Sequence, residues 1–106
     1  MSDVVSALLD QLETELKQQQ LWSDSSPDAL AMASSLPFCC DTLRLEQWLQ
    51  FVFLPKLRFL LQTRRPLPAK VSVLPYAQEV FKTQYSRLGP LLSLIARIDR
   101  ALTGEP

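Results

Sequence analysis

Hydrophobic residues recur every three or four positions along most of the chain, which is the spacing of one face of an α-helix. The first such segment predicts an amphipathic helix over residues 3–20, with its charged side chains on the opposite face. Glu13 and Lys17 stand four residues apart in this segment and can form a weak ion pair. The chain therefore opens with a surface helix that buries one side.

Three further helices are expected outside the central segment. Residues 26–32 begin with a serine and a proline, which is a helix-start signal, and they predict a short helix. Residues 75–87 and 91–102 predict two longer helices, and we expect Gly89 and Pro90 to separate them. No alternating run is long enough to predict a strand.

The most hydrophobic part of the chain, about residues 43–63, predicts a central helix. Between Trp48 and Leu61 only one glutamine, one lysine and one arginine interrupt the apolar residues. Pro55 lies in the middle, where it removes a backbone donor and crowds the preceding turn, so we expect a kink that costs about 3 kcal/mol. We therefore predict an all-α fold, a compact irregular helical bundle of four main helices plus one short helix, in a single domain of residues 1–106. The residues expected to face the core from the central helix are Leu45, Trp48, Leu49, Val52, Phe53, Phe59 and Leu60.

Three large apolar residues, Phe51, Leu54 and Leu61, fall on the polar side of the central helix at α-helical spacing. A helix that is hydrophobic around most of its circumference normally lies in the middle of a fold, and this interpretation is favoured. Alternatively, the three residues form an exposed apolar strip beside Arg58, which would mark a partner-binding surface. The candidate partner-binding residues are Phe51, Leu54, Arg58 and Leu61.

Opposite charges gather in the two halves of the chain. Residues 1–50 contain eight acids and two bases, a net charge of −6, and residues 51–106 contain nine bases and three acids, a net charge of +6. The favoured interpretation is that the halves pack together and their charges interleave. The alternative is a basic patch formed by Arg64, Arg65 and Lys70, which could meet RNA or an acidic protein. Against RNA, nucleic-acid binders usually place aromatics among their bases, whereas the aromatics here are expected to be buried.

The composition fits one cytoplasmic domain. The 106 residues are 47% hydrophobic with a net charge of zero, which is ordinary for a globular protein. The N-terminus lacks a basic leader, and charges punctuate the most apolar stretch, so we expect neither a secretory signal nor a membrane span. Cys39 and Cys40 are neighbours that cannot cross-link distant parts of a fold, which indicates reduced thiols in the cytosol.

The residues that most enzyme chemistries need are missing from the sequence. There is no histidine, so histidine-based triads and histidine metal sites are excluded, and two adjacent cysteines are too few for a structural zinc site. With two glycines in the whole chain, no glycine-rich phosphate loop can form. Glu46, Glu79 or Asp99 could supply a carboxylate pair, but such residues are more often solvated or salt-bridged. We expect no catalytic residues, no metal and no cofactor.

A set of short motifs is spread over essentially the whole chain. They are Leu36-Pro37-Phe38, Asp41-Thr42, the tryptophan-containing run from Glu46 to Pro55, Pro75-Tyr76-Ala77 and Asp99. Together they resemble the YqcC-like family of small bacterial proteins. The resemblance implies a helical bundle, a bacterial cytosolic setting and an association with a tRNA pseudouridine synthase, and it brings no catalytic residues.

These observations favour a non-catalytic protein-interaction module of the bacterial cytosol, with an unidentified protein partner. The alternative is an accessory to RNA modification that binds RNA weakly through its basic C-terminal half. A third possibility, a carrier of a small ligand, would need a cavity near Trp48, Phe53 and Pro55.

Overall fold

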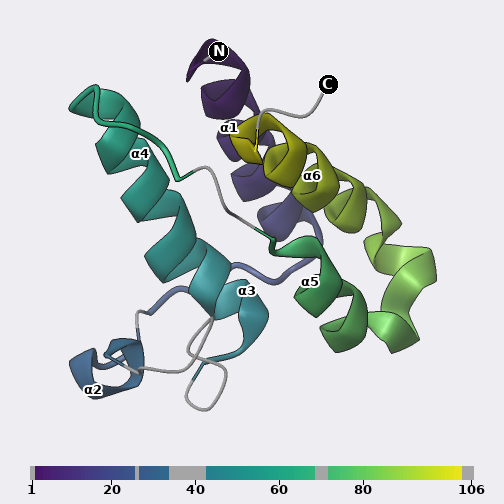
Figure 1. The fold of residues 1–106 in the computed structure, drawn as a ribbon. Coiled ribbons are helices and arrows are strands. Elements are labelled where there is room, and N and C mark those ends of the chain that lie inside the picture. Colours follow the sequence, from purple (N-terminus) through teal and green to yellow (C-terminus); the bar gives the residue numbers. More distant parts are fainter. Residues whose placement is uncertain (1, 26, 34–42, 69–71, 104–106) are drawn as a thin grey trace.

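The computed structural model describes residues 2–25, 27–33, 43–68 and 72–103, and within these ranges all regular structure is helical (Figure 1). The elements are α1 (Ser2–Gln18), α2 (Ala29–Met32), α3 (Leu45–Trp48), the π-helix η2 (Leu49–Phe53), α4 (Leu54–Gln62), α5 (Leu74–Val80), the 3-10 helix η3 (Lys82–Gln84) and α6 (Tyr85–Thr103). Because α3, η2 and α4 join without a gap into one central helix, the predicted all-α bundle with a single short helix, α2, is confirmed.

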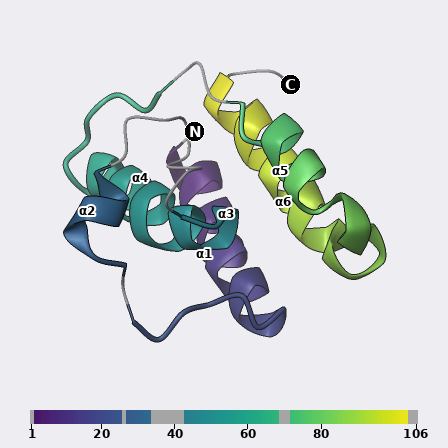
Figure 2. The same cartoon turned by 90° about the horizontal axis from the view of Figure 1, so that it is seen from below.

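Helix α1 lies between the central helix and α6. It contacts α6 along much of its length and α4 on its other side, and both views show this order (Figures 1 and 2). Helix α5 packs against α6. The Cα radius of gyration is 13.4 Å, close to the value of about 13 Å expected for a compact domain of this length.

A single hydrophobic core forms where these helices meet. The amphipathic faces predicted for the first and last helices are confirmed, since their periodic leucines and isoleucines are buried. The buried core residues are Val5, Leu8, Leu9, Leu12 and Leu16 from α1, Leu45, Leu49, Phe53, Leu54 and Leu57 from the central helix, Val73, Ala77 and Phe81 around α5, and Leu88, Leu91, Leu94, Ile95, Ile98 and Leu102 from α6.

The central helix accommodates Pro55 by widening the turn in front of it. Instead of breaking, the chain forms the π-helix η2, in which the Leu54 N–H donates to the Leu49 carbonyl five residues back. Pro55 then occupies the first turn of α4, where a missing N–H is least costly. At the other end, the Gln47 side chain accepts a 3.0 Å hydrogen bond from the Arg44 N–H and caps α3.

The predicted helix boundary at Gly89 and Pro90 is wrong. Both residues lie inside α6, and the chain instead changes direction at Phe81 and η3. Pro90 is tolerated because it is the sixth residue of α6 and its ring faces outward. The missing N–H leaves only the Ser86 carbonyl, in the first turn of α6, without its helical hydrogen bond. A proline close to a helix start is thus a weaker boundary signal than the sequence pattern suggested.

Some predictions fall on residues that the structure does not describe. These are the reduced thiols of Cys39 and Cys40 and the place of Lys70 in the basic patch. Across the described ranges, no helix combines the length and the apolar character that crossing a membrane requires.

Candidate functional site

The predicted apolar strip is only partly at the surface. Leu54 is 1% exposed and belongs to the core, which agrees with the favoured interpretation of a central helix, and the alternative that it faces a partner is wrong. Phe51 and Leu61 are half-buried, and Leu61 packs against the core. These two residues are therefore the remaining part of the strip that a partner could touch.

The cause of the error is the π-turn, which also exposes a residue that the periodicity assigned to the core. A π-turn adds about one residue to a helical turn, so every inward position beyond it moves one residue toward the C-terminus. Leu54 and Leu57 consequently face the core, whereas Phe59 turns outward and is 53% exposed. The prediction that Phe59 is buried is wrong for the same reason.

Arg58 points toward α1 and joins the two oppositely charged halves of the chain. Its Nη1 lies 2.7 Å from Glu13 Oε1, and its Nη2 lies 3.2 Å from Asp10 Oδ1. The expected pair of Glu13 with Lys17 is also present, at 2.7 Å. Arg58 therefore fastens α4 to α1, which makes it a structural residue before any partner is considered.

Lys17 and Arg58 hold the pKa of the Glu13 carboxyl below its usual value. The hydrogen bond from Lys17 is the larger cause, and the hydrogen bond from Arg58 is the second. A lowered pKa in the fold means that the ionised carboxylate adds stability above the ordinary pKa of about 4.3, and that this stability is lost as the pH falls through the lowered value.

We expect Glu13→Gln to remove this pH dependence of the stability. Carboxyl NMR titration should show a larger rise of the Glu13 pKa in Lys17→Met than in Arg58→Met. A Glu13 that titrates at its ordinary value in the wild-type protein would contradict the prediction.

The described part of the predicted basic patch lies at the C-terminal end of α4. Arg64 and Arg65 are both exposed, and Lys70 lies outside the described residues. The Arg65 guanidinium carbon is 5.7 Å from the centroid of the Phe59 ring, within the range of a cation–π contact. The structure thus joins an exposed aromatic ring to the predicted basic residues.

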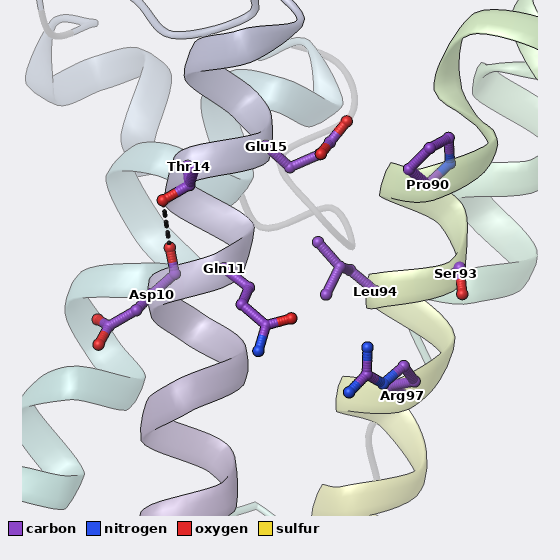
Figure 3. Close-up of a pocket in the computed structure, with 8 residues that line it drawn as sticks. All are labelled: Asp10, Gln11, Thr14, Glu15, Pro90, Ser93, Leu94 and Arg97. Carbon is purple, nitrogen blue, oxygen red and sulfur yellow. Dashed lines mark hydrogen bonds between the residues drawn. The ribbon is translucent and has the colours of Figure 1, made fainter.

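A groove with a volume of about 460 Å³ separates the outer faces of α1 and α6 (Figure 3). Gln11 and Glu15 from α1 and Arg97 from α6 extend toward it, whereas Asp10 points away from it, toward Arg58 on α4. The groove is open and carries charges of both signs, and no cluster among the described residues has the composition of a metal site. The other residues that line it are Thr14, Pro90, Ser93 and Leu94.

Within the described ranges, Phe53 lines a narrow crevice rather than a cavity of the size that a carried ligand would need. The crevice that Phe53 lines together with Val73 and Ile98 is too narrow for a water molecule. This observation removes the main support for the small-ligand hypothesis.

Two polar anchors, one buried and one half-buried, were not predicted from the sequence. Gln50, 7% exposed, accepts a hydrogen bond from the Ser23 N–H at 2.7 Å and donates one to the Ser23 carbonyl at 2.8 Å. Asp99 accepts the Val73 N–H at 3.1 Å and the Leu74 N–H at 2.8 Å, which places a cap on α5 from α6. The signal for Gln50 was a single amide inside a strongly apolar run, but its partner 27 residues away could not be identified from spacing.

Relatives of the chain agree with this fold. An uncharacterized protein of Haemophilus influenzae is 36% identical over 91 residues, which cover 86% of this chain and 85% of that protein. YqcC of Escherichia coli is 31% identical over 97 residues, covering 92% of this chain and 89% of YqcC. The solution NMR structure of E. coli YqcC matches with a TM-score of 0.86 at 28% identity and covers 99% of this chain and 90% of that one.

A third relative is a much longer protein. Over 57 residues, which are 54% of this chain, the chain is 39% identical to a part of tRNA pseudouridine synthase C of Pectobacterium carotovorum, and the matched part makes up 15% of that protein. Residues 4–101 also match the family model DUF446, which is described as tRNA pseudouridine synthase C. Because that model spans nearly the whole chain and YqcC matches 92% of it at 31% identity, the chain belongs to the DUF446 family, the family of YqcC.

Proposed function

We propose that the chain is a non-catalytic accessory to tRNA pseudouridine modification that binds RNA weakly through its basic C-terminal half. The observation that carries this proposal is the 57-residue match to a part of a tRNA pseudouridine synthase C. When a small protein is similar to a segment of a much longer enzyme, the simplest interpretation is that both serve the same process. The description of the family model supports the same assignment.

A non-catalytic role is supported by how the candidate carboxylates are engaged. Asp99 accepts two backbone amides, and Glu79 pairs with Lys82 at 2.9 Å on an exposed surface. Neither arrangement leaves a carboxylate directed into a closed pocket, where a general base would act. We therefore assign the chemistry to the synthase and a binding role to this chain.

The proposal is tested by adding the purified protein to a tRNA pseudouridine synthase C from the same organism and measuring pseudouridine formation in tRNA. We expect no product from the chain alone and a several-fold higher kcat/KM when it is added to the synthase, because tRNA bound nearby is at a higher local concentration. An unchanged rate would remove the accessory role, and product formed by the chain alone would make it an enzyme.

A protein-interaction module is the second candidate, and the same partial match favours it. In the Pectobacterium synthase, the matched segment is part of the enzyme's own chain and therefore stays next to the enzyme. A separate protein of this family would need a binding interface to be held next to the synthase in the same way. Phe51 and Leu61, both half-buried, are the residues of the predicted apolar strip that are left for such a contact. Nuclease-treated pulldown distinguishes the two candidates, since direct docking survives RNA removal and RNA-mediated association does not.

A further inference from the structure

We infer that the outer face of α4 is a binding surface for unpaired RNA, in which the Phe59 ring stacks on an exposed base and Lys56, Arg64 and Arg65 contact the phosphates on either side. This inference rests on the proposed function and adds to it the site, the chemistry and the form of RNA. These four residues are called the α4 platform below.

The exposed aromatic ring is the first reason. Most large apolar side chains of the described core are below 10% exposure, whereas Phe59 is 53% exposed in the middle of a helix. Its ring lies under the Arg65 guanidinium, with 5.7 Å between the guanidinium carbon and the ring centroid. Aromatic rings and guanidinium planes are the two side-chain surfaces on which unstacked RNA bases are commonly placed.

The geometry of α4 brings the platform together. Lys56 and Phe59 are three residues apart and therefore share a face of the helix, which is opposite to the face that buries Leu54 and Leu57. In Figure 1 the C-terminal end of α4 forms a corner of the molecule, away from α5 and α6. A base presented by a loop can reach a ring at such a corner without a clash.

The end of the helix is held in a fixed shape. The Arg65 N–H donates to the Leu60 carbonyl at 2.9 Å and the Arg64 N–H to the Leu61 carbonyl at 3.2 Å, which is a Schellman motif. Arg64 has a φ of 57°, a left-handed conformation that normally selects glycine and costs another residue about 1 kcal/mol. The same motif ends α1, where Gln20 has a φ of 60°, so at Arg64 it serves to fix the positions of the two arginines.

The positive charge around the α4 platform also favours RNA. Residues 51–78 contain five bases and no acid. Of these bases Arg58 is neutralised by α1, whereas no carboxylate in the described ranges forms an ion pair with Lys56, Arg64 or Arg65. Arginines at a helix C-terminus also favour the helix dipole, but that effect does not account for the exposed ring beside them.

Unpaired RNA is favoured over a duplex by the same features. In an A-form duplex the bases are stacked on each other and a protein meets mainly phosphates and 2′-hydroxyls, so only the charges of the platform could act. An unpaired base gains stacking worth about 1 to 3 kcal/mol in addition. The Phe59 ring should therefore discriminate between the two forms of RNA.

The test uses fluorescence anisotropy of the full chain with a labelled single-stranded oligouridylate and with an RNA hairpin duplex, at about 50 and about 200 mM salt. We expect Phe59→Leu to weaken single-strand binding about tenfold and to leave duplex binding unchanged, and Phe59→Trp to retain it. Arg64→Ala and Arg65→Ala should weaken binding to both RNAs and lower the salt dependence. Arg100→Ala, which removes an exposed base from α6, is the charge-matched control and should change neither.

The outcomes separate the inference from the proposed function. Single-strand binding that is unaffected by Phe59→Leu, in a variant that melts like the wild-type protein, would overturn the stacking role of the platform. An equal loss in Arg100→Ala would show that net charge, rather than this site, determines binding. If either occurs while the chain still raises the synthase rate on tRNA, the α4 platform is wrong and the accessory function stands.

Discussion

Replacing Asp99 with alanine is expected to destabilise the fold by about 2 to 4 kcal/mol, because one carboxylate holds the two free backbone amides at the start of α5. Pro75 has no N–H, and the Val73 and Leu74 amides are two of the donors that the first turn of α5 leaves without a partner inside the helix. Without Asp99 these donors are left half-buried, and α5, with seven residues, is too short to be stable alone. Urea unfolding followed by circular dichroism measures the loss.

A set of variants ties this loss to the hydrogen bonds. Asp99→Asn keeps the size of the side chain but has a single carbonyl acceptor, so we expect a smaller loss than for Asp99→Ala. Asp24→Ala removes an exposed acid and should change stability by no more than about 0.5 kcal/mol. Amide exchange in α5 should accelerate first, because α5 would open before the rest of the core. An Asp99→Ala protein as stable as Asp24→Ala would show that α5 needs no cap from α6.

The helices of this fold were largely predictable, because each helix carries its own hydrophobic period. The core faces of α1 and α6 follow from spacing alone, and so does the presence of a long central helix. Burial on one side is a local property of a sequence, since residues three and four apart must point in the same direction. This is why the class of fold and most of the core were foreseen.

The candidate site was less predictable, since two of its properties depend on a single backbone detail. Pro55 indicates that the central helix is irregular, but the sequence does not determine whether the helix kinks, breaks or widens by one residue. The π-turn that forms decides that Leu54 is buried, against the alternative of an exposed strip, and that Phe59 is exposed, against the prediction that it faces the core. An error of one residue therefore moved the aromatic ring from the core to the basic surface.

Polar contacts between residues far apart in the chain also could not be predicted from the sequence. Arg58 is bound by acids 45 and 48 positions earlier in the chain, and Asp99 by amides 25 and 26 positions earlier. The opposite charges of the two halves indicated that such pairs would form, without identifying which bases they would neutralise. Among the described residues, Arg58 pairs with carboxylates of α1, whereas Arg64 and Arg65 form no ion pair. The opposite charges of the two halves therefore meet at Arg58, and the end of α4 keeps its positive charge.

Gln50→Leu is expected to destabilise the fold by about 2 to 3 kcal/mol, even though leucine suits the apolar surroundings. The amide of Gln50 serves both backbone groups of Ser23, and its removal leaves a donor and an acceptor without a partner in a partly buried place. The contact holds the segment after α1 to the π-turn, so its loss also frees the chain that leads to α2. Gln62→Leu, at an exposed site on α4, is the matched control and should stay within about 0.5 kcal/mol of the wild type.

Gln50→Glu tests the donor half of this contact by pH. The carboxylate can still accept from the Ser23 N–H, but its second oxygen would face the Ser23 carbonyl, where the amide now donates across 2.8 Å. Burial and this repulsion raise the pKa of the introduced carboxyl in the fold, so the variant is most stable below the ordinary pKa and loses stability as the pH rises through the raised value. Urea unfolding at pH of about 4 and about 7 should therefore show the smaller deficit, relative to wild type, at the lower pH. A deficit that is the same at both would mean that the Ser23 carbonyl does not depend on Gln50, and that the π-turn is held by apolar packing alone.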